Sequence, residues 1–104
     1  MGEVTLPLLN NMPRTSKLNT PRTVTVSNTA TLVSDATEPW AFRRFRNTDG
    51  SVSVFWGDSN VTATSTNKGQ ELKPGEILEV DYTNSQIYMI TASSTAAISV
   101  IEVG

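Results

Sequence analysis

Residues 41–56, AFRRFRNTDGSVSVFW, contain all three phenylalanines and one of the two tryptophans of this 104-residue chain. The other tryptophan, Trp40, directly precedes this stretch. Two β-prone runs flank the turn-forming residues 47–50, NTDG, in which Gly50 can supply a positive φ. Because aromatic side chains bury large apolar surfaces, we predict that this stretch forms a β-hairpin and provides the main mass of the hydrophobic core.

The remaining sequence also favours strands. Val, Ile and Thr recur in short runs between turn residues, and no long segment shows the 3.6-residue periodicity of a helix. We therefore predict an all-β protein, a small antiparallel β-sandwich or jelly roll of about eight strands. The sandwich domain is expected at 23–104, after an extended N-terminal arm at 1–22.

Local signals place several turns and strands. Pro74 and Gly75 occupy the second and third positions of the turn 73–76, as a type II turn requires. A short strand is expected at 61–64 and a closing strand at 96–103.

The strand near residues 40–47 does not alternate simply. Phe42 and Phe45 have opposite parity, and Arg43 and Arg44 are adjacent, so we expect either a bulge or a strand that is covered on both faces. Because one sheet cannot hide every large side chain on a single face, we predict self-association. An ordinary core strand with arginines along its side remains an alternative. The predicted oligomer interface consists of Trp40, Phe42, Arg43, Arg44, Phe45 and Phe55.

The N-terminal arm, 1–22, is proline-rich and leucine-rich. Its three prolines exclude a regular helix or central strand, and it carries three basic residues against one acidic residue. An extended apolar segment grips a partner by adding to a sheet edge and burying its side chains. A frayed terminus without a role is the alternative. The predicted partner-binding residues are Leu6, Leu8, Leu9, Met12, Arg14, Lys17 and Leu18.

Composition argues against several classes of function. The net charge of −2 gives no reason to expect nucleic-acid binding. The chain has neither cysteine nor histidine, which argues against zinc sites, thiolate chemistry and a triad with a histidine base. No apolar run approaches the roughly 20 residues that span a bilayer, and no signal peptide is recognisable. We expect a soluble, unprocessed protein that is no enzyme and needs no cofactor or metal.

The second half of the chain resembles a known family. The ordered set RNTDGSVSVFWGDSNVT (46–62), GQELKPGE (69–76), IYMI (87–90) and the alanine-containing closing strand is similar to a pattern in small structural proteins of tailed bacteriophages. The resemblance covers about the last 60 residues. It implies a β-sandwich virion component that assembles as a symmetric oligomer, with a trimer favoured.

The expected function follows from this resemblance and the arm together. It is a virion structural protein, made in the host cytoplasm, that binds the major capsid protein or another virion protein as a capsid decoration, stabilising protein or head-fibre anchor. A neck or tail accessory protein is one alternative. A carbohydrate-binding β-sandwich is another, in which Trp40, Trp56 and Tyr82 would stack on sugar rings.

Overall fold

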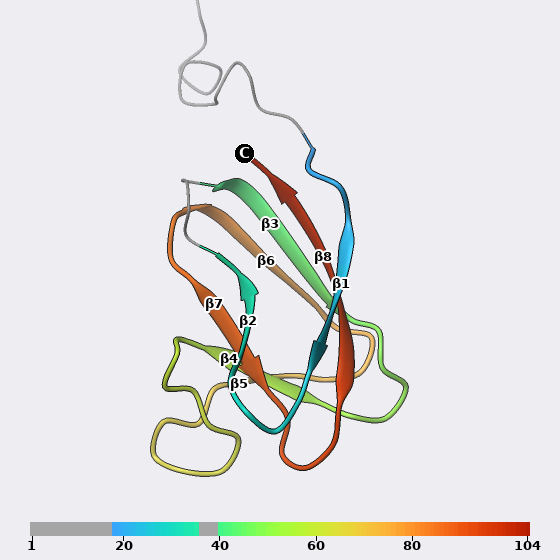
Figure 1. The fold of residues 1–104 in the computed structure, drawn as a ribbon, viewed down its shortest axis with the longest axis vertical. Coiled ribbons are helices and arrows are strands. Elements are labelled where there is room, and N and C mark those ends of the chain that lie inside the picture. The colour runs from blue at the N-terminus through green and yellow to red at the C-terminus, as the bar shows by residue number, and fades with distance from the viewer. Residues whose placement is uncertain (1–17, 36–39) are drawn as a thin grey trace, which may run out of the picture.

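The computed structural model describes residues 18–35 and 40–104, which form two four-stranded antiparallel sheets packed face to face (Figure 1). The described part contains no helix, and the predicted all-β sandwich is confirmed. The strands are β1 (Arg22–Val26), β2 (Thr31–Ser34), β3 (Trp40–Asn47), β4 (Val54–Gly57), β5 (Gln70–Leu72), β6 (Ile77–Thr83), β7 (Ile87–Ile90) and β8 (Ala96–Val103).

The strand order is that of a jelly roll. Sheet A has the order β1-β8-β3-β6 and sheet B the order β2-β7-β4-β5. Among these strands the chain changes sheet at every connection except that between β4 and β5. Strands that are distant in sequence therefore lie side by side, as in other double-sheet β-folds.

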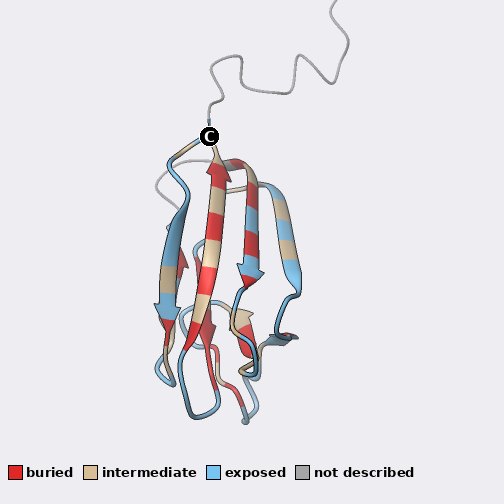
Figure 2. Cartoon of the chain, turned by 90° about the vertical axis from the view of Figure 1, so that its right-hand side faces the viewer, coloured by how far each residue is buried: buried red, intermediate tan, exposed pale blue. Residues whose placement is uncertain are grey.

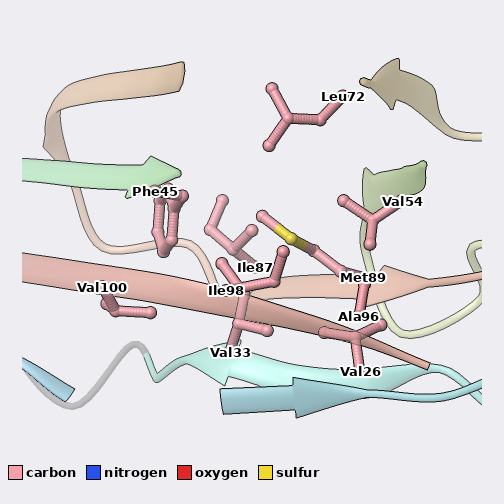
Figure 3. Close-up of a cluster of buried hydrophobic side chains, with 10 residues drawn as sticks. All are labelled: Val26, Val33, Phe45, Val54, Leu72, Ile87, Met89, Ala96, Ile98 and Val100. Carbon is pink, nitrogen blue, oxygen red and sulfur yellow. The ribbon is translucent and has the colours of Figure 1, made fainter. Parts of the chain in front are cut away.

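Period-2 burial positions the core between the sheets. Along β8, buried and half-buried residues alternate over the whole strand (Figure 2). The inward residues of both sheets meet in one cluster, in which the Phe45 ring is fully buried (Figure 3). Burial of each large apolar side chain stabilises the fold by about 1.5–3 kcal/mol. The cluster consists of Val26, Val33, Phe45, Val54, Leu72, Ile87, Met89, Ala96, Ile98 and Val100.

The predicted hairpin at 41–56 is wrong. β3 belongs to sheet A and β4 to sheet B, so the segment between them crosses from one sheet to the other. The buried Asn47 side chain holds this crossover by donating hydrogen bonds to the carbonyl oxygens of Val52 (2.9 Å) and Leu72 (3.0 Å). The turn-forming residues mark a change of direction, but they stabilise a connection between sheets.

The expected positive φ at Gly50 is also wrong, because Gly75 is the glycine in the described residues that adopts one. At the crossover, a carboxylate oxygen of Asp49 instead accepts hydrogen bonds from the backbone N–H groups of Ser51 (2.9 Å) and Val52 (2.8 Å). This Asx-type capping turns the chain without a left-handed residue.

The type II turn at 73–76 is confirmed. Gly75 has a φ of 83°, and the Glu76 N–H donates to the Lys73 carbonyl at 2.9 Å. The closing strand agrees with β8. The strand expected at 61–64 is wrong. This segment belongs to the loop between β4 and β5, in which Thr62 and Lys68 form an isolated bridge.

Candidate functional site

The outer face of sheet A is the side of the sheet that points away from the core. On β3, alternate residues from Ala41 to Asn47 are buried and the intervening ones point outward, with an unbroken register to β8 and no bulge. We define the face by the outward residues of β8, β3 and β6, which the register aligns in three rows: Val103–Phe42–Asp81, Ile101–Arg44–Glu79 and Ser99–Arg46–Ile77.

This face contains a shallow hollow of about 240 Å³, lined by Arg44, Arg46, Ile77, Ser99 and Ile101. The Ile77 side chain is 45% exposed, which is high for a large apolar residue. Arg44 Nε lies 3.5 Å from a carboxylate oxygen of Glu79, and both side chains are about half exposed. Exposed pairs of this kind contribute about 0–1 kcal/mol, so both groups remain available to a partner.

Charges on the face are arranged in adjacent columns. The basic column is Arg44 and Arg46 on β3, and the acidic column is Glu79 and Asp81 on β6. Within the described residues, neither Arg46 nor Asp81 has an ion-pair partner. Exposed apolar and charged groups therefore lie together on one side of the sandwich.

A second polar cluster is buried inside the sandwich. Arg43 and Glu102 are paired across β3 and β8 and point inward. The Ser34 hydroxyl connects them: Arg43 donates to its oxygen (2.9 Å), and the hydroxyl donates to Glu102 (2.6 Å). Arg22 forms an ion pair with the same carboxylate. Burial lowers the pKa of Arg43, and the negative charge of Glu102 opposes this shift.

The contacts of Arg43 identify this cluster as structural. Its guanidinium also donates to the carbonyl oxygens of Ser85 (2.8 Å) and Thr83 (3.5 Å). Its Nε is buried and has no hydrogen-bond partner in the described part of the chain. A buried arginine that donates to a hydroxyl on β2 and to two main-chain carbonyls at the end of β6 and just after it joins strands of both sheets.

Phe55 is covered by its own chain. Its side chain projects from the outer side of sheet B and packs with Val61, Ala63 and Ile90 in a small second cluster. Lys68 lies over the Phe55 ring at 5.3 Å from its centroid, a cation–π distance. The loop between β4 and β5 thus covers the outer side of sheet B around Phe55.

The residues predicted for an oligomer interface are divided by the structure. Phe42 and Arg44 lie on the outer face of sheet A. Arg43, Phe45 and Phe55 are buried within the single chain, so the interface proposed below does not use them. The backbone of Trp40 begins β3, and its side chain lies outside the described residues.

The predicted partner-binding residues fall mostly outside the description. Leu6, Leu8, Leu9, Met12, Arg14 and Lys17 belong to residues 1–17, which the structure does not describe. Leu18 is described: it forms an antiparallel bridge with Val103 and its side chain is 58% exposed. The Asn19 N–H donates to the Glu102 carbonyl at 2.9 Å. Residues 18 and 19 therefore already pair with β8, the strand with which β1 pairs.

Sequence reasoning missed Ile77, Ser99 and Ile101 as members of one surface. Their common parity within β6 and β8 was visible, but the adjacency of both strands to β3 was not. It also missed Ser34 and Glu102 as partners of Arg43, for which no local signal exists.

The described residues contain no group of three or more carboxylates, histidines or cysteines that could hold a metal ion. No helix long and apolar enough to cross a membrane is found in 18–35 and 40–104. Trp56, one of three aromatics considered for sugar stacking, packs against the main core cluster. The Tyr82 side chain, like that of Trp40, lies outside the description.

No protein-family model matches this sequence, and no curated protein matches it. A solved structure from work on Bacillus endospore appendages, described as a novel family of disulfide-linked pili, is similar to the chain with a TM-score of 0.49 and 14% identity. The match covers 96% of both chains. The present sequence contains no cysteine.

Proposed function

We propose that this protein is a non-enzymatic structural protein that associates with copies of itself and with a second protein of a virion. The observation that carries this proposal is the outer face of sheet A, where half-buried Phe42, Ile101 and Val103 lie beside the exposed charges of β3 and β6. Apolar surface of this kind marks sites of protein–protein contact. The hydroxyl, guanidinium and carboxylate groups of Ser34, Arg43 and Glu102 instead belong to the buried hydrogen-bond network.

The resemblance to bacteriophage structural proteins supports the finer assignment. It favours attachment to the major capsid protein, as a decoration, a stabilising protein or a head-fibre anchor, and a location on the virion. The trimer implied by the same resemblance belongs to this proposal. A role in sugar binding has weaker support, because Trp56 packs against the core.

The N-terminal segment is the proposed contact to the capsid. Leu6, Leu8 and Leu9 supply apolar side chains, and the segment enters the sandwich at Leu18 beside the end of β8. Burial of three leucines contributes on the order of 5–9 kcal/mol, which corresponds to several powers of ten in affinity at about 1.4 kcal/mol each.

The test is occupancy on purified capsids that lack the protein. The full-length chain is compared with a variant that lacks residues 1–17 and retains the Leu18 and Asn19 contacts with β8. We expect the full-length chain to remain on the particles after sedimentation and the truncated chain to wash off. Equal occupancy would contradict the role of the arm, and absence of both proteins from the particles would contradict capsid attachment.

A further inference from the structure

We infer that copies of this chain join through the two edges of sheet A, with β6 of one copy paired to β1 of the next. The inference deepens the self-association proposed above, rests on that part of the proposal, and needs no capsid for its test. Sheet A has the order β1-β8-β3-β6, so β1 and β6 are its outer strands (Figure 1). No described strand pairs with the free side of either one. An open strand edge of this kind is a template for pairing with another chain.

The backbone of β6 presents hydrogen-bonding groups at its free edge. The Asn47 N–H donates to the Glu76 carbonyl oxygen at 3.0 Å, at the start of the β3–β6 ladder. Because the backbone groups of successive residues in an antiparallel strand point to opposite sides, the even-numbered residues of β6 bond to β3. The odd-numbered residues Ile77, Glu79 and Asp81 then point their N–H and C=O groups to the free edge. β6 contains no proline, so each of these groups can bond to a partner strand.

The backbone of β1 presents matching groups at the opposite edge. The Thr48 N–H donates to the Ala97 carbonyl oxygen at 3.0 Å, which continues the β3–β8 register. Odd-numbered residues of β8 therefore bond to β3, and even-numbered ones bond to β1. The β1 partners of these even-numbered residues are Arg22, Val24 and Val26. Thr23 and Thr25, which lie between them, consequently point their N–H and C=O groups to the free edge.

The directions of the two edge strands fit a cyclic assembly. Every neighbouring pair of strands in sheet A is antiparallel, so β1 and β6 run in opposite directions. Rotation about an axis parallel to the strands preserves their directions, and β6 of one copy therefore meets β1 of the next as an antiparallel pair. Head-to-tail contacts of this kind close into rings, which is compatible with the trimer proposed above. Ring closure makes the last contact intramolecular and strengthens the assembly.

The outward side chains of the two edges are complementary in one register. It places Glu79 opposite Thr25 of the next copy. Two residues along, it places Asp81 opposite Thr23. All four side chains are exposed in the single chain, and each carboxylate then lies beside a threonine hydroxyl that donates a hydrogen bond to it. Pairing of β6 with a second β6 would instead place carboxylates opposite each other, which is unfavourable.

The inward side chains agree with the same register. It brings Val80 opposite Val24 and Leu78 opposite Val26 of the next copy. Val24, Leu78 and Val80 are only partly buried where they pack against the core cluster. A strand from the next copy covers part of their remaining surface, so the pairing buries apolar groups and also forms backbone hydrogen bonds. Because one strand pair is a small interface, we expect reversible, concentration-dependent association.

The test uses two proline variants of the full-length chain, Thr25→Pro and Glu79→Pro, and analytical ultracentrifugation over a range of concentrations. Each proline removes an N–H group from one free edge and leaves the hydrogen bonds to β8 or β3 in place, because proline is tolerated on the solvent side of an edge strand. We expect each variant alone to require at least about tenfold higher concentrations than the unaltered chain to associate.

A mixture of the two variants tests the head-to-tail pairing directly. A Thr25→Pro copy retains its β6 edge, and a Glu79→Pro copy retains its β1 edge. We expect the mixture to form one-to-one pairs, at concentrations where each variant alone is monomeric, and nothing larger. Self-pairing of β1 would instead let Glu79→Pro associate alone, and self-pairing of β6 would let Thr25→Pro associate alone.

The matched control is Thr66→Pro. Thr66 is exposed in the loop between β4 and β5, at the second position of a turn in which the Lys68 N–H donates to the Ser65 carbonyl oxygen at 3.0 Å. Proline is favoured at this position of a turn, and the loop lies on sheet B, away from both edges of sheet A. We expect this variant to associate like the unaltered chain.

A second set of variants is used if melting temperatures show that a proline variant is unfolded. Thr25→Glu places a second carboxylate opposite Glu79 and should weaken association, by about threefold per contact. Addition of Glu79→Lys to the same chain places opposite charges together in every contact and should restore association.

The inference is overturned if a folded proline variant associates like the unaltered chain, if the mixture contains no pairs, or if Glu79→Lys does not restore association to Thr25→Glu. In each of these cases the unaltered chain still associates, and the self-association in the proposed function stands on another surface. A monomeric unaltered chain would contradict both the edge pairing and the proposed self-association. Capsid occupancy is measured separately and tests the attachment to the capsid.

Discussion

The buried Glu102 carboxylate balances the charges of two arginines, the fully buried Arg43 and Arg22, whose side chain is 41% exposed. This carboxylate is 4% exposed and contacts Arg22 and the Ser34 hydroxyl, which in turn receives a hydrogen bond from Arg43. A buried ionic group of this kind adds little net stability compared with an apolar isostere, but the loss of one partner leaves uncompensated charge. The effect of Glu102 on stability therefore depends on its burial beside Arg43 and not on the number of ion pairs that it forms.

We predict that Glu102→Gln lowers the free energy of unfolding by about 3–5 kcal/mol, because it leaves the buried Arg43 cation without a counter-charge. Chemical denaturation measures this difference. Glu71→Gln, on the exposed side of β5, is the matched control and should change stability by less than about 0.5 kcal/mol. Equal stability of both variants would mean that the network contributes nothing.

Gly69 lies where a Cβ atom has no space. An added Cβ would be 2.5 Å from the Trp56 carbonyl oxygen and 2.6 Å from a Val61 methyl group. We predict that Gly69→Ala destabilises the fold by about 1–3 kcal/mol through overpacking, equivalent to several degrees in melting temperature for a domain of this size. Gly50→Ala is the control, since no atom lies within 4 Å of its added Cβ. A similar melting temperature for both alanine variants would show that the loop adjusts freely.

At the scale of elements, the β3–β4 crossover depends on an ionised side chain. Hydrogen bonds from the backbone N–H groups of Ser51 and Val52 hold the pKa of Asp49 below its ordinary value. A depressed carboxyl pKa contributes stability that is present above the unfolded pKa of about 3.9 and lost as the pH falls through the folded pKa.

We therefore predict that Asp49→Asn flattens the acid side of the stability profile. Melting temperatures of the unaltered chain should fall more steeply than those of the variant between about pH 5 and pH 2. Asp58→Asn is the matched control, because the Asp58 carboxylate accepts a hydrogen bond from the Asn60 N–H in a different turn. Parallel profiles for the unaltered chain and Asp49→Asn would contradict a role for the ionised carboxylate.

The elements also show what could be predicted from sequence. The turn at 73–76 and the closing strand β8 follow from local chemistry, because Pro74 and Gly75 fix backbone angles and alternation marks a half-buried strand. The topology of 41–56 does not follow from local chemistry, because turn-forming residues specify where the chain bends but not which sheet the next strand joins. The inward orientation of Arg43 could not be predicted either, because its acceptors lie on other segments of the chain, at Ser34, Thr83 and Ser85.

At the scale of the whole molecule, the boundary between arm and sandwich follows backbone hydrogen bonding. We predict that a chain without residues 1–17 melts like the full-length monomer, whereas deletion through Thr20 lowers stability by about 1 kcal/mol. The longer deletion removes the Asn19 hydrogen bond to Glu102 and the Leu18 bridge to Val103. Differential scanning calorimetry at low protein concentration measures the stability of both deletion variants. A large loss of stability in the shorter deletion would place the leucines of 1–17 in the core of the domain.

The central claim is that this sandwich works by assembly, with sheet A joining copies and the arm joining a capsid. The most direct test is a mass measurement of the purified full-length protein, alone and mixed with capsids that lack it. We predict a concentration-dependent mass above that of one copy for the protein alone, and loss of free protein to the particles after mixing. A single-copy mass at all concentrations together with undiminished free protein after mixing would contradict the claim.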